Sequence, residues 1–590
     1  MDNTGKLIIY QAFPRILSNT TEGCVPNGTL EQNGSGKLND ITAKLLKSLS
    51  DLGINCIWLT GIIENATKTA YPEAGIPADN PNVVKGEAGS PYAIKDYYDV
   101  APCLAVNVPN RMKEFEACVK RIHKQGLKVL IDFVPNHTAR VYHSDSAPTG
   151  IEDFGQSDDH NMFFNPNNNY YYIVNQQFSP GFDISSQGDT PYVEFPAKAT
   201  GNDCFTAFCS ENDWYETVKL NYGLDPWNGQ GSYDPIPDTW LKMLHILRFW
   251  ASKGVDGFRC DMVFMVPQEF WHWAIPQVKK DYPDVIFIGE IYDIYLYRPF
   301  LEYCHFDYLY DKVNLYDTLV GIERFNWSAA QLTTCWQRVE GLGDSMLNFL
   351  ENHDEVRFAS KEFANDPMKV APYLVVSALM TNGPFMVYYG QELGEMARDN
   401  EGFAGDNNRS TIFDYWSYDT IRRWYNDGKC TLTKLTQHEK WLRKLYKTVL
   451  HIAKDIPAFY KGKFFDLMYV NHFNPKFNPH RQYAFLRYTD EEAYLVIANF
   501  ESEEKEIEVN IPELALGMAK IETGQQKAND LLWNKRQIFT VSDREPARFK
   551  VGGYDAMIVP LKVHKEEKST EASSENKALE KKTMAKKMEN

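Results

Sequence analysis

The chain has 590 residues, long enough for more than one domain, and its charged and hydrophobic fractions of 24% and 43% are ordinary for a globular protein. Its formal net charge of −17 argues against nucleic acid and anionic membranes as partners, and no apolar run approaches the roughly 20 residues that span a bilayer. The first residues, MDNTGKLIIYQAF, lack the basic start and the long apolar stretch of a secretory signal. We therefore expect a cytoplasmic protein, or a periplasmic or secreted one if a leader has been removed.

The first part of the chain alternates apolar strands with amphipathic helices. Strands of the buried type that are each followed by a helix pair in parallel, with the helices as crossovers. The helix that ends near Gly53 has apolar residues at helical spacing and a glycine at its C-cap. The pattern predicts strands at residues 7–13, 56–62 and 128–135, and helices at 40–53 and 112–126.

The alternation breaks after His137. Residues 138–227 are rich in Asn, Asp, Pro, Gly and Tyr and have no helical period, and this stretch is too long for an ordinary loop. We expect a small irregular domain inserted after the third strand. The alternation then resumes with a helix at residues 238–254 and strands at 254–262, 285–291, near 306–309, 345–352 and 384–390. Eight strands with helical crossovers predict an α/β fold of the (β/α)8 TIM barrel type.

A different pattern follows the helix at residues 439–455, which would close the barrel. Short alternating strands separated by turns predict an antiparallel β-sandwich, and the final residues are too polar to form a core. The predicted domains are the first part of the barrel (1–137), an inserted domain B (138–227), the second part of the barrel (228–455), the C-terminal β-sandwich (456–563) and a disordered tail (564–590).

The ten cysteines predict free thiols. Cys56 and Cys260 lie in apolar, strand-like runs, where a cysteine is more often a buried thiol than a disulfide partner. Cys204 and Cys209 are close in sequence, but no second pair completes a zinc-binding pattern.

Polar clusters follow four of the expected barrel strands, at the end of a barrel where catalytic groups lie. Any one of them has an ordinary explanation, such as a helix N-cap or an ion pair between Arg259 and Asp261. Four clusters in register are much harder to explain by structure alone. They are Asp132–His137, Gly257–Asp261, Gly289–Glu290 and Glu351–Asp354.

The four segments resemble, in the right order, the four short conserved regions of glycoside hydrolase family 13, the α-amylase family. Three further stretches resemble the loop after the second strand, the end of the inserted domain and the last strand of that family. The resemblance covers roughly residues 5 to 560. The seven segments are IDFVPNH (131–137), GFRCD (257–261), IGEI (288–291), LENHD (350–354), SPYAIKDYYDV (90–100), VKLNYG (218–223) and GPFMVYYGQELG (383–394).

The resemblance implies that Asp261 is a nucleophile, Glu290 a general acid/base and Asp354 a stabiliser of the transition state. Cleavage of an acetal passes through an oxocarbenium-like transition state, and a nucleophilic carboxylate with a protonated carboxyl at the leaving oxygen gives retention. Burial and two neighbouring carboxylates would raise the pKa of Glu290, as an acid needs. Arg259, on the same face of its strand, can keep Asp261 ionised.

The resemblance also implies substrate contacts. His137 and His353 match histidines that form hydrogen bonds with the sugar hydroxyls at the cleavage site, and Tyr92 matches a ring that stacks beneath the sugar. Arg259 and Arg357 belong to the same predicted set, with Arg357 and Asp132 expected to act as supporting residues.

A structural calcium ion is the one cofactor that the resemblance raises. Asn136 matches a residue that ligates Ca²⁺ between the barrel and the insert in many family members, whereas some relatives lack the ion, so a metal site and an ordinary structural role stay open. Where typical members have Lys-His after the nucleophile, this chain has Phe264 and Met265 within Met-Val-Phe-Met. Asp183, Asp189 and Asp225 are the possible further ligands from the insert.

Together these features predict a retaining glycoside hydrolase that cleaves α-glucosidic bonds, most naturally α-1,4 bonds, in maltooligosaccharides, starch or glycogen fragments. A transglycosylase or isomerase of the same family shares the covalent intermediate and stays an alternative. A non-catalytic glycan-binding subunit usually lacks one of the acids, whereas this chain has all three. The sequence leaves open α-1,4 against α-1,6 preference, endo against exo action and the oligomeric state.

Overall fold

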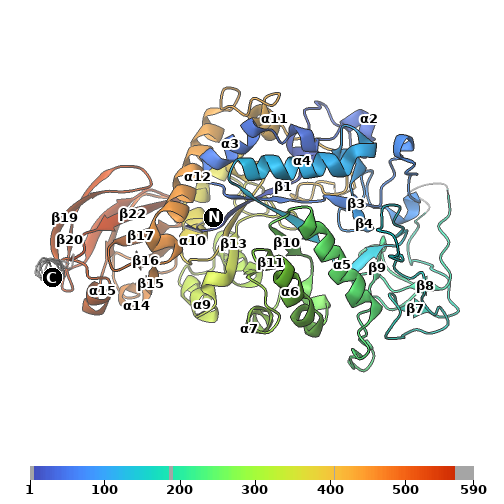
Figure 1. Cartoon of the computed structure of the whole chain (residues 1–590). Coiled ribbons are helices and arrows are strands. Elements are labelled where there is room, and N and C mark those ends of the chain that lie inside the picture. Colours follow the sequence, from blue (N-terminus) through green and yellow to red (C-terminus); the bar gives the residue numbers. More distant parts are fainter. Residues whose placement is uncertain (1–4, 185–189, 404, 565–590) are drawn as a thin grey trace, which may run out of the picture.

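A closed barrel of eight parallel strands forms the centre of the computed structural model, which describes residues 5–184, 190–403 and 405–564 (Figure 1). Around the barrel the strands run β1 (Ile8–Ala12), β2 (Cys56–Leu59), β5 (Lys128–Phe133), β10 (Gly257–Cys260), β11 (Ile286–Gly289), β12 (Tyr308–Tyr310), β13 (Met346–Phe349) and β14 (Phe385–Tyr388). Pairing of β14 with β1 closes the barrel. The predicted α/β barrel is therefore confirmed, with its sixth strand at β12.

Helices cover the outside of the barrel, as the apolar spacing predicted. α3 (Ala43–Leu52) buries its leucines and ends at Gly53, which takes φ 115°, a conformation that favours glycine. The closing helix, α12 (Gln437–Asp455), begins with a capping box between Thr436 and Glu439. The other helices are α1 (Pro14–Leu17), α2 (Leu30–Asn33), α4 (Arg111–Lys124), α5 (Asp238–Ser252), α6 (Gln268–Asp281), α7 (Tyr297–Glu302), α8 (Asp317–Arg324), α9 (Gln331–Arg338), α10 (Val370–Leu379) and α11 (Asp419–Tyr425).

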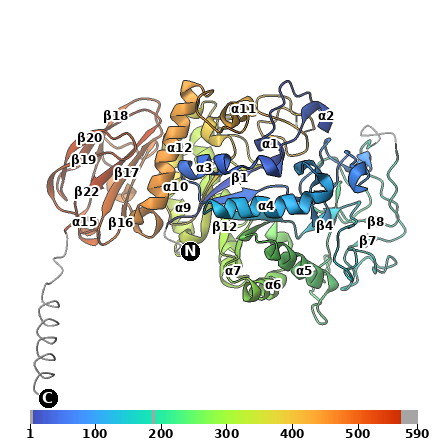
Figure 2. The ribbon, with the colours of Figure 1, turned by 45° about the horizontal axis from the view of Figure 1, so that its top comes forward.

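The insert after β5 is irregular, as its composition predicted. It holds two short antiparallel ladders, β6 (His137–Ala139) with β9 (Thr217–Lys219), and β7 (Tyr172–Ile173) with β8 (Ala197–Lys198). Another antiparallel pair, here called the β3–β4 hairpin, joins β3 (Ile63–Asn65) to β4 (Ile94–Val100) in the segment between β2 and α4. The insert and this hairpin lie at one end of the molecule, opposite the C-terminal strands (Figures 1 and 2).

The C-terminal strands form antiparallel sheets, which confirms the predicted β-sandwich. α10 packs against β17 and β22, so the sheet is fixed to the barrel. The largest sheet has the order β15 (Lys463–Asp466), β16 (Gln482–Tyr488), β17 (Ala493–Asn499) and β22 (Asp555–Leu561), beside the pairs β18 (Lys505–Val509) with β21 (Ala547–Val551) and β19 (Gly524–Asn529) with β20 (Arg536–Val541). The short helices here are α13 (Pro457–Tyr460), α14 (Met468–Asn471) and α15 (Glu513–Met518).

Three further predictions concern the tail, the cysteines and the membrane. Of the predicted tail, residues 565–590 lie outside the described residues. All ten cysteines carry free thiols, as predicted. Among the described helices, none combines the length and the apolar character that crossing a bilayer requires.

Candidate active site

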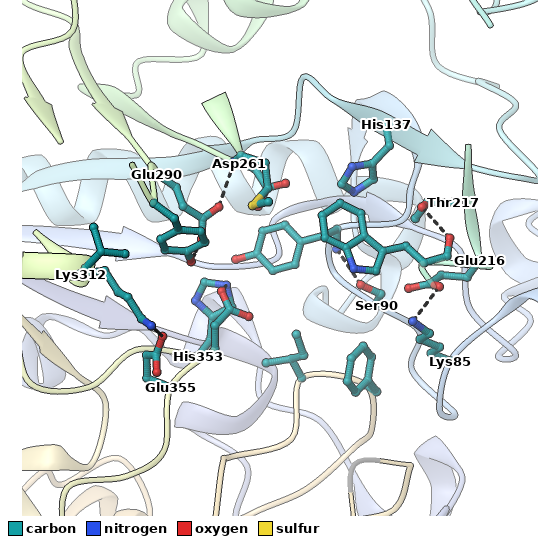
Figure 3. A pocket seen from close by; sticks show the side chains of 18 residues that line it. Lys85, Ser90, His137, Glu216, Thr217, Asp261, Glu290, Lys312, His353 and Glu355 are labelled. Atoms are coloured by element: carbon teal, nitrogen blue, oxygen red, sulfur yellow. Dashed lines mark hydrogen bonds and ion pairs between the residues drawn. The ribbon is translucent and has the colours of Figure 1, made fainter. Parts of the chain in front are cut away.

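A cavity of about 540 Å³ lies where the barrel strands end. The predicted acids Asp261, Glu290 and Asp354 all line it, because each follows the C-terminal end of a barrel strand (Figure 3). Asp261 directly follows β10, and Glu290 directly follows β11. Asp354 lies five residues beyond β13, with 40% of its side chain exposed. The fold thus brings together three carboxylates that are up to 93 positions apart in the sequence.

Arg259 lies beneath the cavity lining and contacts two of these carboxylates. Its guanidinium lies 2.7 Å from Asp261 Oδ1 and 2.6 Å from Glu290 Oε1. The rings of Trp58, Tyr92 and Tyr310 surround the guanidinium, with their centroids at 5.3, 5.4 and 5.5 Å. Arg259 is fully buried and does not line the cavity, so it positions the acids and does not present a surface to a ligand.

The three acids differ in their ease of ionisation. Burial, together with the charges of Asp261 and Asp354, raises the pKa of Glu290 to about 7, although Arg259 and the Tyr292 hydroxyl oppose the rise. Burial also raises the pKa of Asp261, and Arg259 opposes it. For Asp354 burial is outweighed by His353 and Arg259, which hold its pKa at about 2. Near neutral pH the site therefore offers one proton-carrying carboxyl beside an ionised carboxylate.

His353 lies between Asp354 and Tyr92. Its Nε2 is 3.0 Å from Asp354 Oδ2, and its ring stacks on that of Tyr92 with centroids 5.0 Å apart. The amide of Gln11, on β1, lies 2.9 Å from the other ring nitrogen. Although burial opposes the change, Asp354 raises the pKa of His353. Both predicted residues, His353 and Tyr92, line the cavity.

His137 is held by a relay that begins with a buried lysine. The Lys219 ammonium donates to Asn136 Oδ1 at 2.5 Å, and an ammonium can only donate, so the Asn136 NH₂ must face the other way. That NH₂ donates to the carbonyl of Gly201 at 2.7 Å and lies 3.1 Å from His137 Nδ1. Since Nδ1 accepts, Nε2 carries the ring proton. Burial lowers the pKa of His137 to about 4, so the ring is a neutral donor that lines the cavity.

Comparison with known proteins decides the family. Residues 11–456 match the family described as Alpha amylase, catalytic domain, which is more than half of the chain. The chain belongs to the α-amylase family, glycoside hydrolase family 13.

The relatives share modest identity with this family member. The chain is 25% identical over 433 residues to an oligo-1,6-glucosidase from Parageobacillus thermoglucosidasius. The match covers 66% of this chain and 65% of that protein, so the chain spans less than two thirds of this relative's length. It is 24% identical over 577 residues to an α-glucosidase from Apis mellifera, covering 86% and 87%. The structure of maltogenic α-amylase AmyB from Thermotoga neapolitana matches with a TM-score of 0.60 and 19% identity, covering 95% of this chain and 99% of that one, and shows the shared fold.

Arg357 does not reach the cavity of this family member. It is fully buried and donates to Glu351 Oε2 at 3.0 Å, to the Tyr389 carbonyl at 2.8 Å and to Ser410 Oγ at 2.8 Å. It therefore connects the ends of β13 and β14. Asp132 also has a supporting position, because it accepts hydrogen bonds from the backbone N–H of Gly61 and from the Tyr92 hydroxyl.

The place expected for Ca²⁺ in this family member is filled by the Lys219 ammonium. Besides Asn136, the ammonium contacts the Met265 carbonyl at 3.0 Å and Asp203 Oδ1 at 2.6 Å. Three oxygens around an ammonium fall short of the six to eight or so that Ca²⁺ takes. The residues therefore do not fit the ion. Of the ligands considered from the insert, Asp225 instead accepts hydrogen bonds within its own turn, and Asp189 lies outside the described residues.

A second acidic group lies on the β3–β4 hairpin, and its four carboxylates come within 4.8 Å of one another. Arg111 pairs with Asp99, and Asp96 accepts hydrogen bonds from Tyr98, Ser144, Asp145 and Ser146. The group consists of Glu64, Asp96, Asp99 and Asp145. These hydrogen bonds and this ion pair connect the β3–β4 pair to the insert, which gives the acidic group a structural role.

Several of the residues at this site were not predicted from the sequence. Tyr292 donates to Glu290 at 2.6 Å, and its place two residues after the acid could have suggested it. Trp58 lies behind the cavity wall, where its ring flanks Arg259 and lies edge-on to His353 at 5.8 Å. Further cavity residues that the sequence did not indicate include Lys85, Trp214, Glu216, Lys312, Glu355 and Phe413.

Proposed function

We propose that this chain is a retaining glycoside hydrolase that cleaves α-glucosidic bonds, α-1,4 bonds above all, in maltooligosaccharides and in starch or glycogen fragments. The observation that carries the proposal is the single guanidinium of Arg259 between Asp261 and Glu290. It holds the two carboxyl groups as close neighbours, and retention needs a separation of about 5–5.5 Å. The membership of the chain in the α-amylase family supports the same assignment, as does the raised pKa of Glu290, which suits a general acid.

In the proposed reaction Asp261 attacks the anomeric carbon while Glu290 gives its proton to the leaving oxygen. The bond between that carbon and the leaving oxygen breaks, and a glycosyl ester forms on Asp261. Glu290, now a carboxylate, takes a proton from a water molecule, whose oxygen attacks the same carbon and releases Asp261. The charge on Asp354 stabilises the positive charge that develops on the sugar ring in both steps.

The remaining contacts orient the sugar. The Nε2–H of His137 offers a donor to its hydroxyls, and Tyr92 provides an apolar face beneath it. His353 already contacts Asp354 and Gln11 through its two ring nitrogens, so it holds Asp354 in place beside the sugar. Arg259 keeps Asp261 ionised for the attack. Arg357 and Asp132 act on the sugar through these residues and not by contact.

A transglycosylase is the second candidate, and one observation favours it. The ring of Phe264 lies 6.1 Å from that of Tyr292, beside the acid Glu290. An aromatic pair at this point would hold an acceptor sugar better than the polar residues it replaces, so that a sugar hydroxyl would compete with water. A purely glycan-binding role is disfavoured because all three acids line one cavity.

We also propose that Lys219, and not Ca²⁺, joins the barrel to the insert at Asn136. The ammonium already neutralises Asp203 and satisfies the oxygens of Asn136 and Met265. A metal ion would have to displace it.

A time course of products from maltoheptaose tests the proposed function. The native protein should release shorter maltooligosaccharides, and Asp261→Asn should not. Asp256→Asn is the matched control, because Asp256 precedes the opposite end of β10 and accepts a hydrogen bond from the backbone of Val129. Longer products that form early would assign a transglycosylase. Equal turnover by native protein and Asp261→Asn would refute the role of Asp261.

A further inference from the structure

The positions of the acid and the nucleophile give the cavity a direction. Glu290 protonates the leaving oxygen, so the leaving group lies on the side where Glu290 and Lys312 lie. Figure 3 shows these residues on one side of Asp261, and Lys85 and Glu216 on the opposite side. The sugar that is attacked, and any sugars toward its non-reducing end, must therefore point toward Lys85 and Glu216.

Three distant segments meet on that side and form what we call the end wall: Lys85, Trp214, Glu216 and Phe413. Lys85 Nζ lies 2.9 Å from Glu216 Oε2, and their side chains are only 11% and 6% exposed. The Trp214 ring lies 5.3 Å from the ring of His137, so the wall begins directly beside the attacked sugar.

The loop that carries Lys85 is fixed to the segment that carries Phe413. The backbone N–H of Ala88 donates to the Phe413 carbonyl at 3.0 Å, and that of Glu87 donates to Asp414 at 3.0 Å. Gly86 has φ 68°, and a Cβ there would lie 2.3 Å from the Phe413 carbonyl oxygen. Backbone hydrogen bonds and this close approach therefore join the two segments at this point of the cavity wall.

The opposite end of the cavity is more open. There Lys312 and Glu355 form an ion pair at 3.4 Å, with side chains 23% and 20% exposed. An enzyme that cuts inside a chain needs a groove that is open at both ends. A wall across the other end would restrict the cavity to a chain terminus.

We propose, on the basis of the proposed function, that the end wall makes the enzyme act from the non-reducing end of α-glucans and release a short product of fixed length. Glu216 and Lys85 recognise the terminal hydroxyls that an internal residue lacks. The Glu216 carboxylate accepts, and the Lys85 ammonium donates, so the ion pair offers both kinds of partner to a hydroxyl. Trp214 gives the terminal ring an apolar face.

Two forms of maltoheptaose test this inference, each with a fluorescent label at the reducing end. One has a free non-reducing end, and the other carries a 4,6-acetal there. The native enzyme should cleave the free form with a kcat/KM roughly 100-fold higher than that of the blocked form. From the free form it should produce a ladder of labelled products that shorten stepwise by one repeated length. Equal cleavage of both forms, with mixed labelled products from the start, would overturn the inference while upholding the proposed function.

Variants then locate the discrimination. Lys85→Ala combined with Trp214→Ala opens the wall, and it should narrow the ratio between free and blocked substrate by about tenfold or more. Lys312→Ala is the matched control at the other end, and it should leave that ratio unchanged even if the rates fall. A ratio that responds to Lys312→Ala and not to the double variant would overturn the role of the wall. Cleavage of neither substrate by the native protein would instead overturn the proposed function, on which the inference depends.

Discussion

The hydrogen bond from Tyr292 to Glu290 sets the pH at which the acid works. The hydroxyl lies 2.6 Å from Glu290 Oε1 and stabilises the ionised carboxylate, so Tyr292→Phe should raise the pKa of Glu290 above its present value of about 7. A hydrogen bond to a charged group contributes about 1.5–3 kcal/mol, and one pKa unit corresponds to about 1.4 kcal/mol. We expect a rise of about one unit, the lower end of that range, because Arg259 still contacts the same oxygen.

The pH dependence of kcat/KM on maltoheptaose measures this change. Glu290 must carry a proton to act as the acid, so its deprotonation sets the alkaline limb, and a higher pKa moves that limb to higher pH by about one unit. The acidic limb, set by ionisation of Asp261, should stay in place. Tyr297→Phe is the control, because Tyr297 also donates to a carboxylate, Asp311 at 3.4 Å, but away from the cavity. An alkaline limb that stays in place or moves to lower pH in Tyr292→Phe would refute the reasoning.

Two further predictions concern stability. Lys219→Met should lower the free energy of unfolding by about 2–3 kcal/mol, because it leaves buried oxygens without their donor. Lys198→Met should lower that free energy by less. EDTA should not change the Tm of the native protein. Denaturant titration measures the first effect, and a fall in Tm with EDTA would contradict the proposal that Lys219 takes the place of Ca²⁺. The pKa of Asp354 is about 2 in the folded state and 3.8 ordinarily, so its ion pair adds stability above pH 3.8 that is lost as the pH falls toward 2. Asp354→Asn should remove that part of the acid sensitivity in Tm measurements, and an unchanged acid profile would contradict it.

The barrel and its acids were predictable because both depend on local patterns. Each barrel strand is a short buried run, and Asp261 and Glu290 follow their strands directly, so the fold fixes where they lie once the strands are known. Arg357 follows Asp354 by only three residues, and the resemblance placed it in the substrate-contact set as a supporting residue. The chain turns there, with Asn352 Oδ1 accepting from the backbone N–H of Asp354 and Glu355, and the turn directs Arg357 under the end of β14.

The position of Lys219 at the expected calcium site and the end wall could not be predicted, because both depend on long-range contacts. Asn136 and Lys219 are 83 positions apart, and Lys85 and Glu216 are further apart still. Lys219 lies in a recognised motif, but the motif does not say that its ammonium reaches Asn136. Such pairs become visible only when the insert is placed against the barrel.

One short ladder connects the insert to the chemistry. β6 pairs with β9 so that His137 lies opposite Lys219 and Ala139 opposite Thr217. The same segment places Thr217 in the cavity wall and the Lys219 ammonium at Asn136, which fixes the ring proton of His137 on Nε2. Thr217 and Lys219 are two positions apart and share one face of β9, so a slip of one residue would turn both side chains away from these positions. The register of this ladder therefore places both the His137 donor and the Thr217 side chain at the cavity, so that the insert forms part of the candidate site and does not only cover it.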